Sequence, residues 1–278
     1  MFYEKVQKRV EEHYKYLIDK GYEVAGIFLV GSYNYGLEYE KSDVDTKAII
    51  IPSVREVLFN SKPISKTIIL ENGEHIEVKD IREMIKCLKK QNLNFLEILF
   101  TKYFVFNPKY ENILRPLFKY REKIACYDVK ASINCARGMI YKKRKNMEKE
   151  RPGNIENFQK YGYDCKELHH ILRMVDFLEK FCSGELMYYQ CLIPIHYDTI
   201  MKAKQGKYTI EQAKQMAEQA INRMESIYWN FSLNTKLNRE IFVDKEFIDN
   251  LFNDVVEMSF YERLKETNFT GENYYGKY

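Results

Sequence analysis

A short stretch near the start of the chain carries the residues with the clearest chemical meaning. Gly31 and Ser32 follow an apolar run, and after ten further residues come Asp43 and Asp45, separated by a single valine. A glycine at the end of a strand lets backbone amides approach a ligand closely, and a serine hydroxyl adds one more donor. Because these groups suit a phosphate, the Gly-Ser pair predicts a phosphate-binding turn.

The two aspartates predict a divalent cation beside that turn. Side chains two residues apart on a strand point to the same face, and two carboxylates so placed repel each other unless a cation lies between them. Mg²⁺, or Mn²⁺ in its place, is held by a few carboxylates together with substrate phosphates. Two such ions can bind the attacking and leaving oxygens of a phosphoryl displacement. Asp43 and Asp45 therefore favour metal-dependent phosphoryl chemistry.

A third carboxylate is expected from a neighbouring strand. Glu77 stands between two apolar residues in an alternating run, so its side chain is expected on the opposite face from theirs, the face of the two aspartates. Glu74 and Asp80 lie within a few residues and stay open as alternatives. Taken singly, a Ser-Asp-x-Asp is more often a turn and a lone glutamate more often a solvated hairpin face. Their combination favours a site.

The elements that would position these residues follow from hydrophobic periodicity and turn signals. Alternating and apolar runs predict strands at 24–30, 43–51, 67–70 and 75–79. An Asn-Gly pair between the last two predicts a hairpin. Helical spacing and caps predict helices over 2–20, 53–59, 80–91 and 93–100, with Ser53 and Asp80 as N-caps.

After Pro108 helical periodicity dominates. Helices are expected over about 110–121, where Pro116 could break the helix, and over 128–149, 164–183, 209–229 and 244–264. The predicted fold class is α+β, with a small mixed sheet and its flanking helices followed by an α-helical domain. The predicted domains are residues 1–107 and 108–278.

Composition excludes some classes and leaves others open. The chain has 278 residues and a formal charge of +4, too small an excess to identify a nucleic-acid binder. The longest apolar run, 25–30, is far too short to span a bilayer, and the N-terminus has no apolar signal core. The six cysteines show no metal-ligand spacing. A cytoplasmic protein with free thiols and no membrane partner is expected.

Four segments resemble one known family. The chain is similar to the DNA polymerase β nucleotidyltransferase superfamily, and within it to the RNA-repair-associated, RlaP-like branch. The resemblance is carried by Gly31–Leu37 (GSYNYGL), Ser42–Asp45 (SDVD), Asn92–Phe100 (NLNFLEILF) and Tyr163–Lys166 (YDCK) with His170 and Arg173. Leu93 stands where that branch usually has proline, and Met174 where it has leucine.

The resemblance implies a nucleotidyltransferase sheet and a set of site residues. It implies Asp43, Asp45 and Glu77 as catalytic metal ligands, Gly31 and Ser32 as triphosphate contacts, and NTP with Mg²⁺ as cofactors. Spacing puts Lys166, His170 and Arg173 on one helical face, which suits phosphates. A solvated helix face is the commoner explanation of such a stripe, but the matching motif favours nucleotide binding.

Two further features leave alternatives open. Residues 142–145 (Lys-Lys-Arg-Lys), with Arg137 before them, could follow a nucleic-acid backbone or the triphosphate, although a solvated helix face is more common. Tyr163 could stack on a base or pack in a core.

The expected reaction is nucleotidyl transfer from an NTP to an acceptor hydroxyl, with release of pyrophosphate. The family association favours an RNA end, such as that of a tRNA, as acceptor. A protein-modifying nucleotidyltransferase, which attaches AMP to a partner protein, is one alternative, and a nucleotide-binding module without turnover is another. The preferred NTP, the need for a template and the oligomeric state stay open.

Overall fold

A five-stranded mixed sheet forms the centre of the molecule. The computed structural model describes residues 2–39, 42–233 and 243–265. The strands lie in the order β3-β4-β2-β1-β5, with β2 parallel to β4 and the other neighbours antiparallel. Their bounds are β1 Val24–Val30, β2 Asp45–Ile50, β3 Ser65–Ile69, β4 His75–Asp80 and β5 Phe104–Phe106. The predicted α+β class with a mixed sheet is confirmed.

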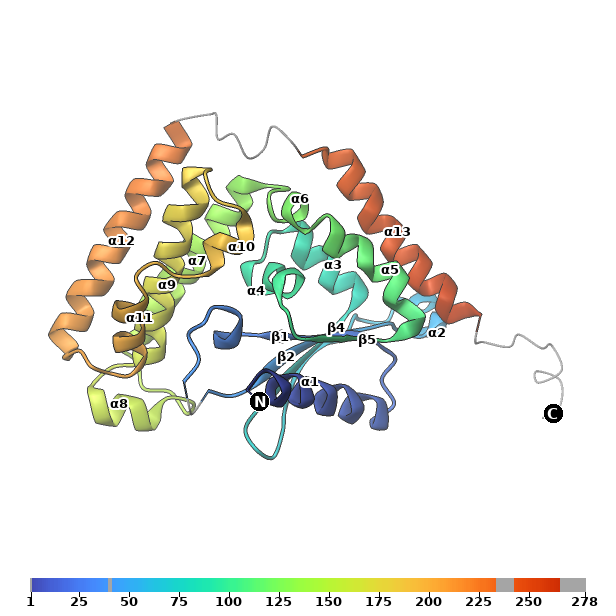
Figure 1. The fold of residues 1–278 in the computed structure, drawn as a ribbon, viewed down its shortest axis with the longest axis horizontal. Coiled ribbons are helices and arrows are strands. Elements are labelled where there is room, and N and C mark those ends of the chain that lie inside the picture. Colours follow the sequence, from blue (N-terminus) through green and yellow to red (C-terminus); the bar gives the residue numbers. More distant parts are fainter. Residues whose placement is uncertain (1, 40–41, 234–242, 266–278) are drawn as a thin grey trace.

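Helices cover both faces of this sheet (Figure 1). Helix α1 (Phe2–Asp19) packs on one face through Val6, Val10 and Leu17, all of them buried. The opposite face is covered by α3 (Ile81–Lys89), α4 (Leu93–Leu96) and α5 (Pro108–Lys119), with α13 (Lys245–Leu264) packed against α5 and α3. Every residue of β1 is buried, as expected of a strand with both faces covered.

Local signals in the sequence explain where several elements begin. The Ser53 side chain caps α2 (Val54–Leu58) in a capping box with Glu56, and Asp80 caps α3. Gly73 has a φ of 85° in the predicted Asn-Gly hairpin between β3 and β4. Pro116 does not break α5, which runs through it.

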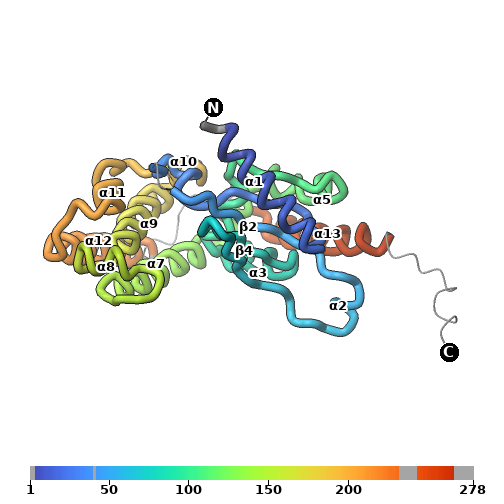
Figure 2. The backbone as a smooth tube through the Cα atoms, turned by 90° about the horizontal axis from the view of Figure 1, so that it is seen from below, coloured from blue at the N-terminus to red at the C-terminus, as the bar shows by residue number. Residues whose placement is uncertain are grey.

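The remaining helices form a second body beside the sheet (Figures 1 and 2). In it α9 packs against α7, α11 and α12. The helices are α6 Arg121–Ala125, α7 Val129–Met147, α8 Ile155–Tyr161, α9 Cys165–Ser183, α10 Tyr188–Leu192, α11 Tyr197–Lys204 and α12 Ile210–Leu233. The short helices α6, α8, α10 and α11 and the strand β5 were not predicted. No helix in the described part of the chain is both long and apolar enough to cross a membrane.

The two bodies share one continuous hydrophobic core. A single buried cluster reaches from Phe28 and Ile49 of the sheet to Phe177 of α9 and Phe252 of α13. The chain also returns to the sheet near its end, where Arg263 Nη1 lies 2.6 Å from the Glu23 carboxylate. The division between residues 107 and 108 stays a prediction.

Candidate active site

The Gly-Ser turn and the aspartate pair meet at one end of two adjacent strands. Val30, the last residue of β1, pairs in register with Asp45, the first residue of β2. Gly31 follows with φ 85° and ψ −151°, and Ser32 opens the 3₁₀ turn η1 (Ser32–Asn34). Only glycine adopts that backbone conformation without strain, so the sharp turn depends on Gly31. The antiparallel pairing thus brings both sequence signals to the same edge.

Asp45 is half-exposed and has a neighbour that the sequence did not indicate. Its Oδ1 atom lies 3.1 Å from the backbone nitrogen of His75, which donates to it, and 3.1 Å from His75 Nδ1. The parallel pairing of β2 with β4 makes His75 adjacent. Asp43 is exposed and precedes β2, so the prediction that both aspartates belong to one strand is wrong for Asp43. The pair of aspartates is therefore open to a ligand.

Glu77 lies on the same face of the sheet as Asp45, but its carboxylate is engaged by two lysines. It pairs in register with Lys47, two residues after Asp45. Glu77 Oε2 is 3.3 Å from Lys47 Nζ, and Glu77 Oε1 is 3.5 Å from Lys79 Nζ. Lys47 in turn lies 3.7 Å from Glu97 Oε1.

The two alternative third acids have other partners. Glu74 binds Arg9 and His13 of α1, on the opposite side of the sheet. Burial alone would raise the pKa of Glu74, but hydrogen bonds from Arg9, Asn72 and His13 outweigh it and lower the pKa to about 2. Asp80 is fully buried, where it caps α3 and pairs with Arg82 at 2.7 Å.

Glu97 links the Gly-Ser turn to Lys47. It is buried at 5% exposure in the 3₁₀ helix η2 (Glu97–Phe100). Its carboxylate accepts a hydrogen bond from the Tyr35 hydroxyl, and a long one, 3.5 Å, from the backbone N–H of Gly31. Burial, followed by the Glu97 charge, raises the pKa of Tyr35. Tyr35 and Glu97 both belong to the motifs that carry the family resemblance, and neither was singled out from the sequence.

The predicted phosphate-binding face of α9 contacts the loop after the Gly-Ser turn through one residue, Arg173. Lys166, His170 and Arg173 are the residues of the helix's first half that are not buried, which confirms their common face. The Arg173 guanidinium carbon lies 4.1 Å from the centroid of the Tyr35 ring. Part of His170 is accessible, but the surrounding protein removes most water from its ring. This desolvation, and next the neighbouring His169, lowers the pKa of His170 well below its ordinary value.

Lys204 makes a second contact between the helical body and the loop that precedes the aspartates. Lys204 Nζ of α11 donates to the carbonyl of Leu37 at 2.6 Å and lies 3.4 Å from Ser42 Oγ. Burial, and next the positive charge of Lys166, lowers the pKa of Lys204 to about 8. Lys204 had not been singled out, because its role depends on a contact between segments far apart in the chain.

Several other motif residues are structural. Tyr163 is fully buried and its hydroxyl donates to the carbonyl of Tyr208 at 3.2 Å, so it packs in the core. The basic cluster of α7 is partly neutralised by acids. These ion pairs are Arg137–Glu225, Lys143–Glu167, Arg144–Glu148 and Arg144–Glu218.

The donor set fits a divalent cation only in part. Asp43, and Asp45 through the oxygen that does not face His75, offer carboxylate oxygens of the type that Mg²⁺ and Mn²⁺ prefer. Across residues 2–39, 42–233 and 243–265, no three histidine, cysteine, aspartate or glutamate side chains are placed to hold a metal ion. Glu77 is the member that does not fit, because lysines lie against both of its oxygens.

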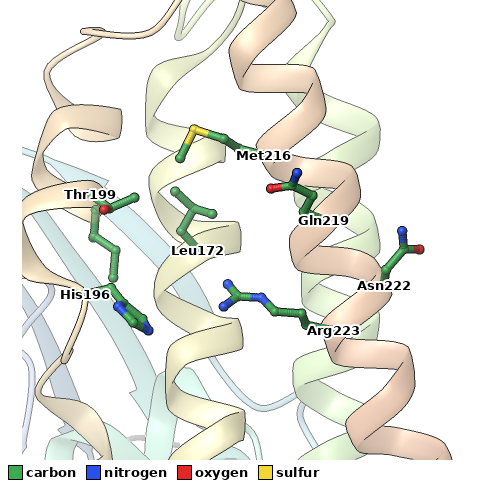
Figure 3. A pocket seen from close by; sticks show the side chains of 8 residues that line it. Leu172, His196, Thr199, Met216, Gln219, Asn222 and Arg223 are labelled. Carbon is green, nitrogen blue, oxygen red and sulfur yellow. The ribbon is translucent and has the colours of Figure 1, made fainter.

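A groove of about 540 Å³ lies elsewhere, between α9, α11 and α12 (Figure 3). Its lining includes Leu172, His196, Met216 and Arg223. None of the candidate site residues lines it.

Comparison with known proteins adds little to this geometry. No family model matches the chain, and no curated protein matches its sequence. Among solved structures it is similar to a nucleotidyltransferase-like protein from Exiguobacterium sibiricum. The likeness covers 76% of this chain and 70% of that one, at 14% identity and a TM-score of 0.29. Because so distant a likeness carries no argument about activity, the function must be argued from the site.

Proposed function

We propose that the chain is a nucleotidyltransferase that transfers a nucleoside monophosphate from an NTP to an acceptor hydroxyl. The observation that supports it most is the pairing of Val30 with Asp45, which brings the Gly-Ser turn beside the open aspartate pair. The turn offers a hydroxyl and backbone amides to phosphate oxygens. A triphosphate bound there would have its reacting phosphate next to the two carboxylates.

The reaction breaks one bond and forms another at the α-phosphorus. The acceptor oxygen attacks that phosphorus, the bond to the oxygen bridging to the β-phosphate breaks, and pyrophosphate leaves with that oxygen. The hydroxyl proton passes to the aspartate pair, and the half-exposed His75 beside Asp45 offers it a path to solvent. Mg²⁺ or Mn²⁺ bound by Asp43 and Asp45 would lower the pKa of the acceptor hydroxyl and screen the phosphate charge.

The helical body contributes positive charge near the leaving group. Lys166 is exposed, and Arg173 lies over the Tyr35 ring in the loop that follows the Gly-Ser turn. We assign both to the β- and γ-phosphates, because cations that meet charge on a leaving pyrophosphate favour its departure. His170, on the same face, belongs with them as a nucleotide contact.

Two acceptors are proposed in order. An RNA end comes first, from the family resemblance. A hydroxyl of a partner protein comes second, and one observation favours it: Arg137, Lys143 and Arg144 of the basic cluster are paired with acids, which weakens a nucleic-acid track along α7.

The test is transfer of ³²P from each α-labelled NTP, with Mg²⁺ or Mn²⁺, into a pool of small RNAs and of proteins. We expect label in one fraction, and loss of that label in an Asp43→Asn/Asp45→Asn variant. Asp254→Asn, at an exposed position on α13, is the matched control and keeps activity. Label in protein would move the second acceptor to first place. NTP binding without label in either fraction would contradict turnover and favour a binding module.

A further inference from the structure

Two buried lysines share one small space on the site's face of the sheet. Lys47 and Lys79 are each only 8% exposed. Their ammonium nitrogens lie 5.0 Å and 4.7 Å from the centroid of the same ring, that of Phe95. A buried charge is costly unless it is paired and hydrogen-bonded. These two cations therefore require counter-charge from nearby carboxylates.

Two glutamates supply that charge. Glu77 lies between the lysines, 3.3 Å from Lys47 Nζ and 3.5 Å from Lys79 Nζ. Glu97 lies 3.7 Å from Lys47 Nζ. Lys79 completes its contacts by donating to Ser65 Oγ at 2.8 Å. Two positive and two negative groups make a neutral quartet, which we define as Lys47, Lys79, Glu77 and Glu97.

A divalent cation on Glu77 would upset this balance. Each Glu77 oxygen already faces an ammonium, so a bound dication would lie beside a like charge in a partly buried setting, where repulsion is strong. The dication would take up the negative charge of Glu77. Glu97 would then be the one carboxylate of the quartet left to balance the two ammonium charges. Asp45 differs, since its side chain is 41% exposed and the group that faces it is the imidazole of His75 and not an ammonium.

We infer that Glu77 is the counter-ion of the buried lysine pair and not a ligand of the cation, which Asp43 and Asp45 hold with the substrate phosphates. The part of this inference that concerns the cation rests on the proposed function, while the ion pairs stand by themselves. Glu77 is then a positioning residue, because Lys47 follows Asp45 by two residues on β2 and Glu97 contacts the Gly-Ser turn.

Titration with Mn²⁺ alone, followed by the electron paramagnetic resonance signal of free Mn²⁺, tests the cation part. Glu77→Gln is expected to bind Mn²⁺ within about twofold of the wild type, whereas Asp45→Asn is expected to bind roughly tenfold more weakly or worse. Equal weakening in the two variants would overturn the inference.

A double-mutant cycle in chemical unfolding tests the counter-ion part. Glu77→Gln, Lys47→Met and the double variant keep side-chain volume, and circular dichroism checks that each folds. We expect the effect of Glu77→Gln on the unfolding equilibrium to shrink by roughly tenfold in the Lys47→Met background. An unchanged effect would contradict the pairing. If the wild type binds no Mn²⁺, the proposed cation fails, and the cycle still decides the role of Glu77.

Discussion

Gly31 is the site residue whose identity is fixed most firmly by the backbone. Its φ of 85° and ψ of −151° lie where a side chain is strained, although an added Cβ would meet no atom within 4 Å. The requirement therefore comes from the turn itself and not from crowding. The sequence correctly placed Gly31 at the end of a buried strand, and its contact with a phosphate stays a prediction.

Replacing Gly31 by alanine is predicted to cost about 1–3 kcal/mol of stability, since alanine must adopt a glycine-only conformation. NTP affinity should fall as well, because the turn carries the phosphate donors. Urea unfolding and a nucleotide titration measure the two effects. Gly138→Ala, in the middle of α7 with open space around it, is the matched control and should gain about 0.5–1 kcal/mol. Equal effects at both positions would contradict the assignment of the turn.

Glu97 was missed from the sequence because its role exists only in three dimensions. Its partners Tyr35 and Lys47 are brought to it by the loop after β1 and by β2. Glu97→Gln is predicted to destabilise the protein by about 3 kcal/mol, the lower end for a broken buried pair, because Lys47 keeps Glu77. Chemical unfolding measures this. Glu257→Gln, exposed on α13, should stay within about 0.5 kcal/mol of the wild type.

Most long elements were predictable because their signals are local. The apolar run of β1, the caps of α2 and α3 and the Asn-Gly hairpin all appear where expected. The strand β5 was not predicted, since three residues, Phe-Val-Phe, carry too little periodicity to be separated from loop. Strand order was also beyond local signals, and with it the adjacency of His75 to Asp45 and of Lys47 to Glu77.

Helix α9 carries a pH-dependent contribution to stability. Burial, and next the Arg173 charge, lowers the pKa of His169 to about 3 from an ordinary 6.5. The unfolded chain therefore takes up a proton first as the pH falls, and the free energy of unfolding declines between about pH 6.5 and pH 3. For one proton the slope is about 1.4 kcal/mol per pH unit.

His169→Asn should reduce that slope by the amount due to one proton. Asparagine keeps a polar group near the Ile200 carbonyl, which His169 Nδ1 approaches at 3.3 Å. Urea unfolding at several values between pH 4 and pH 6.5 measures the slope. His196→Asn, at an exposed position on the connection before α11, is the matched substitution. An unaltered slope in His169→Asn would show that His169 does not cause the acid dependence.

Segments from both halves of the chain pack around the sheet, an arrangement that composition could not indicate. Residues after the predicted boundary at 107 supply α5, which covers one sheet face together with α3 and α4, and α13, which packs against α5 and α3. The helical body meanwhile presents Arg173 and Lys204 to the loop that carries the Gly-Ser turn. Both bodies therefore contact the loop of the candidate site, whereas its carboxylates come from the first body alone.

A fragment of residues 1–107 is predicted not to fold cooperatively, because it would expose Phe28, Ile49 and Phe106, which face α5 and the shared core. Circular dichroism during thermal unfolding checks this, with the full chain beside it. A sharp cooperative transition in the fragment would mean that the first 107 residues form an autonomous domain.

Following the α- and γ-phosphates of the NTP separately shows whether the chain transfers a nucleotide. Reactions with α-³²P-NTP and γ-³²P-NTP, run in parallel on the acceptor fraction that takes up label, separate nucleotidyl transfer from the transfer of a terminal phosphoryl group. We expect the α-label to stay on the acceptor while the γ-label appears as pyrophosphate in equal amount, and we expect Asp43→Asn/Asp45→Asn to abolish both. Retention of the γ-label on the acceptor, or full activity in the double variant, would contradict this expectation.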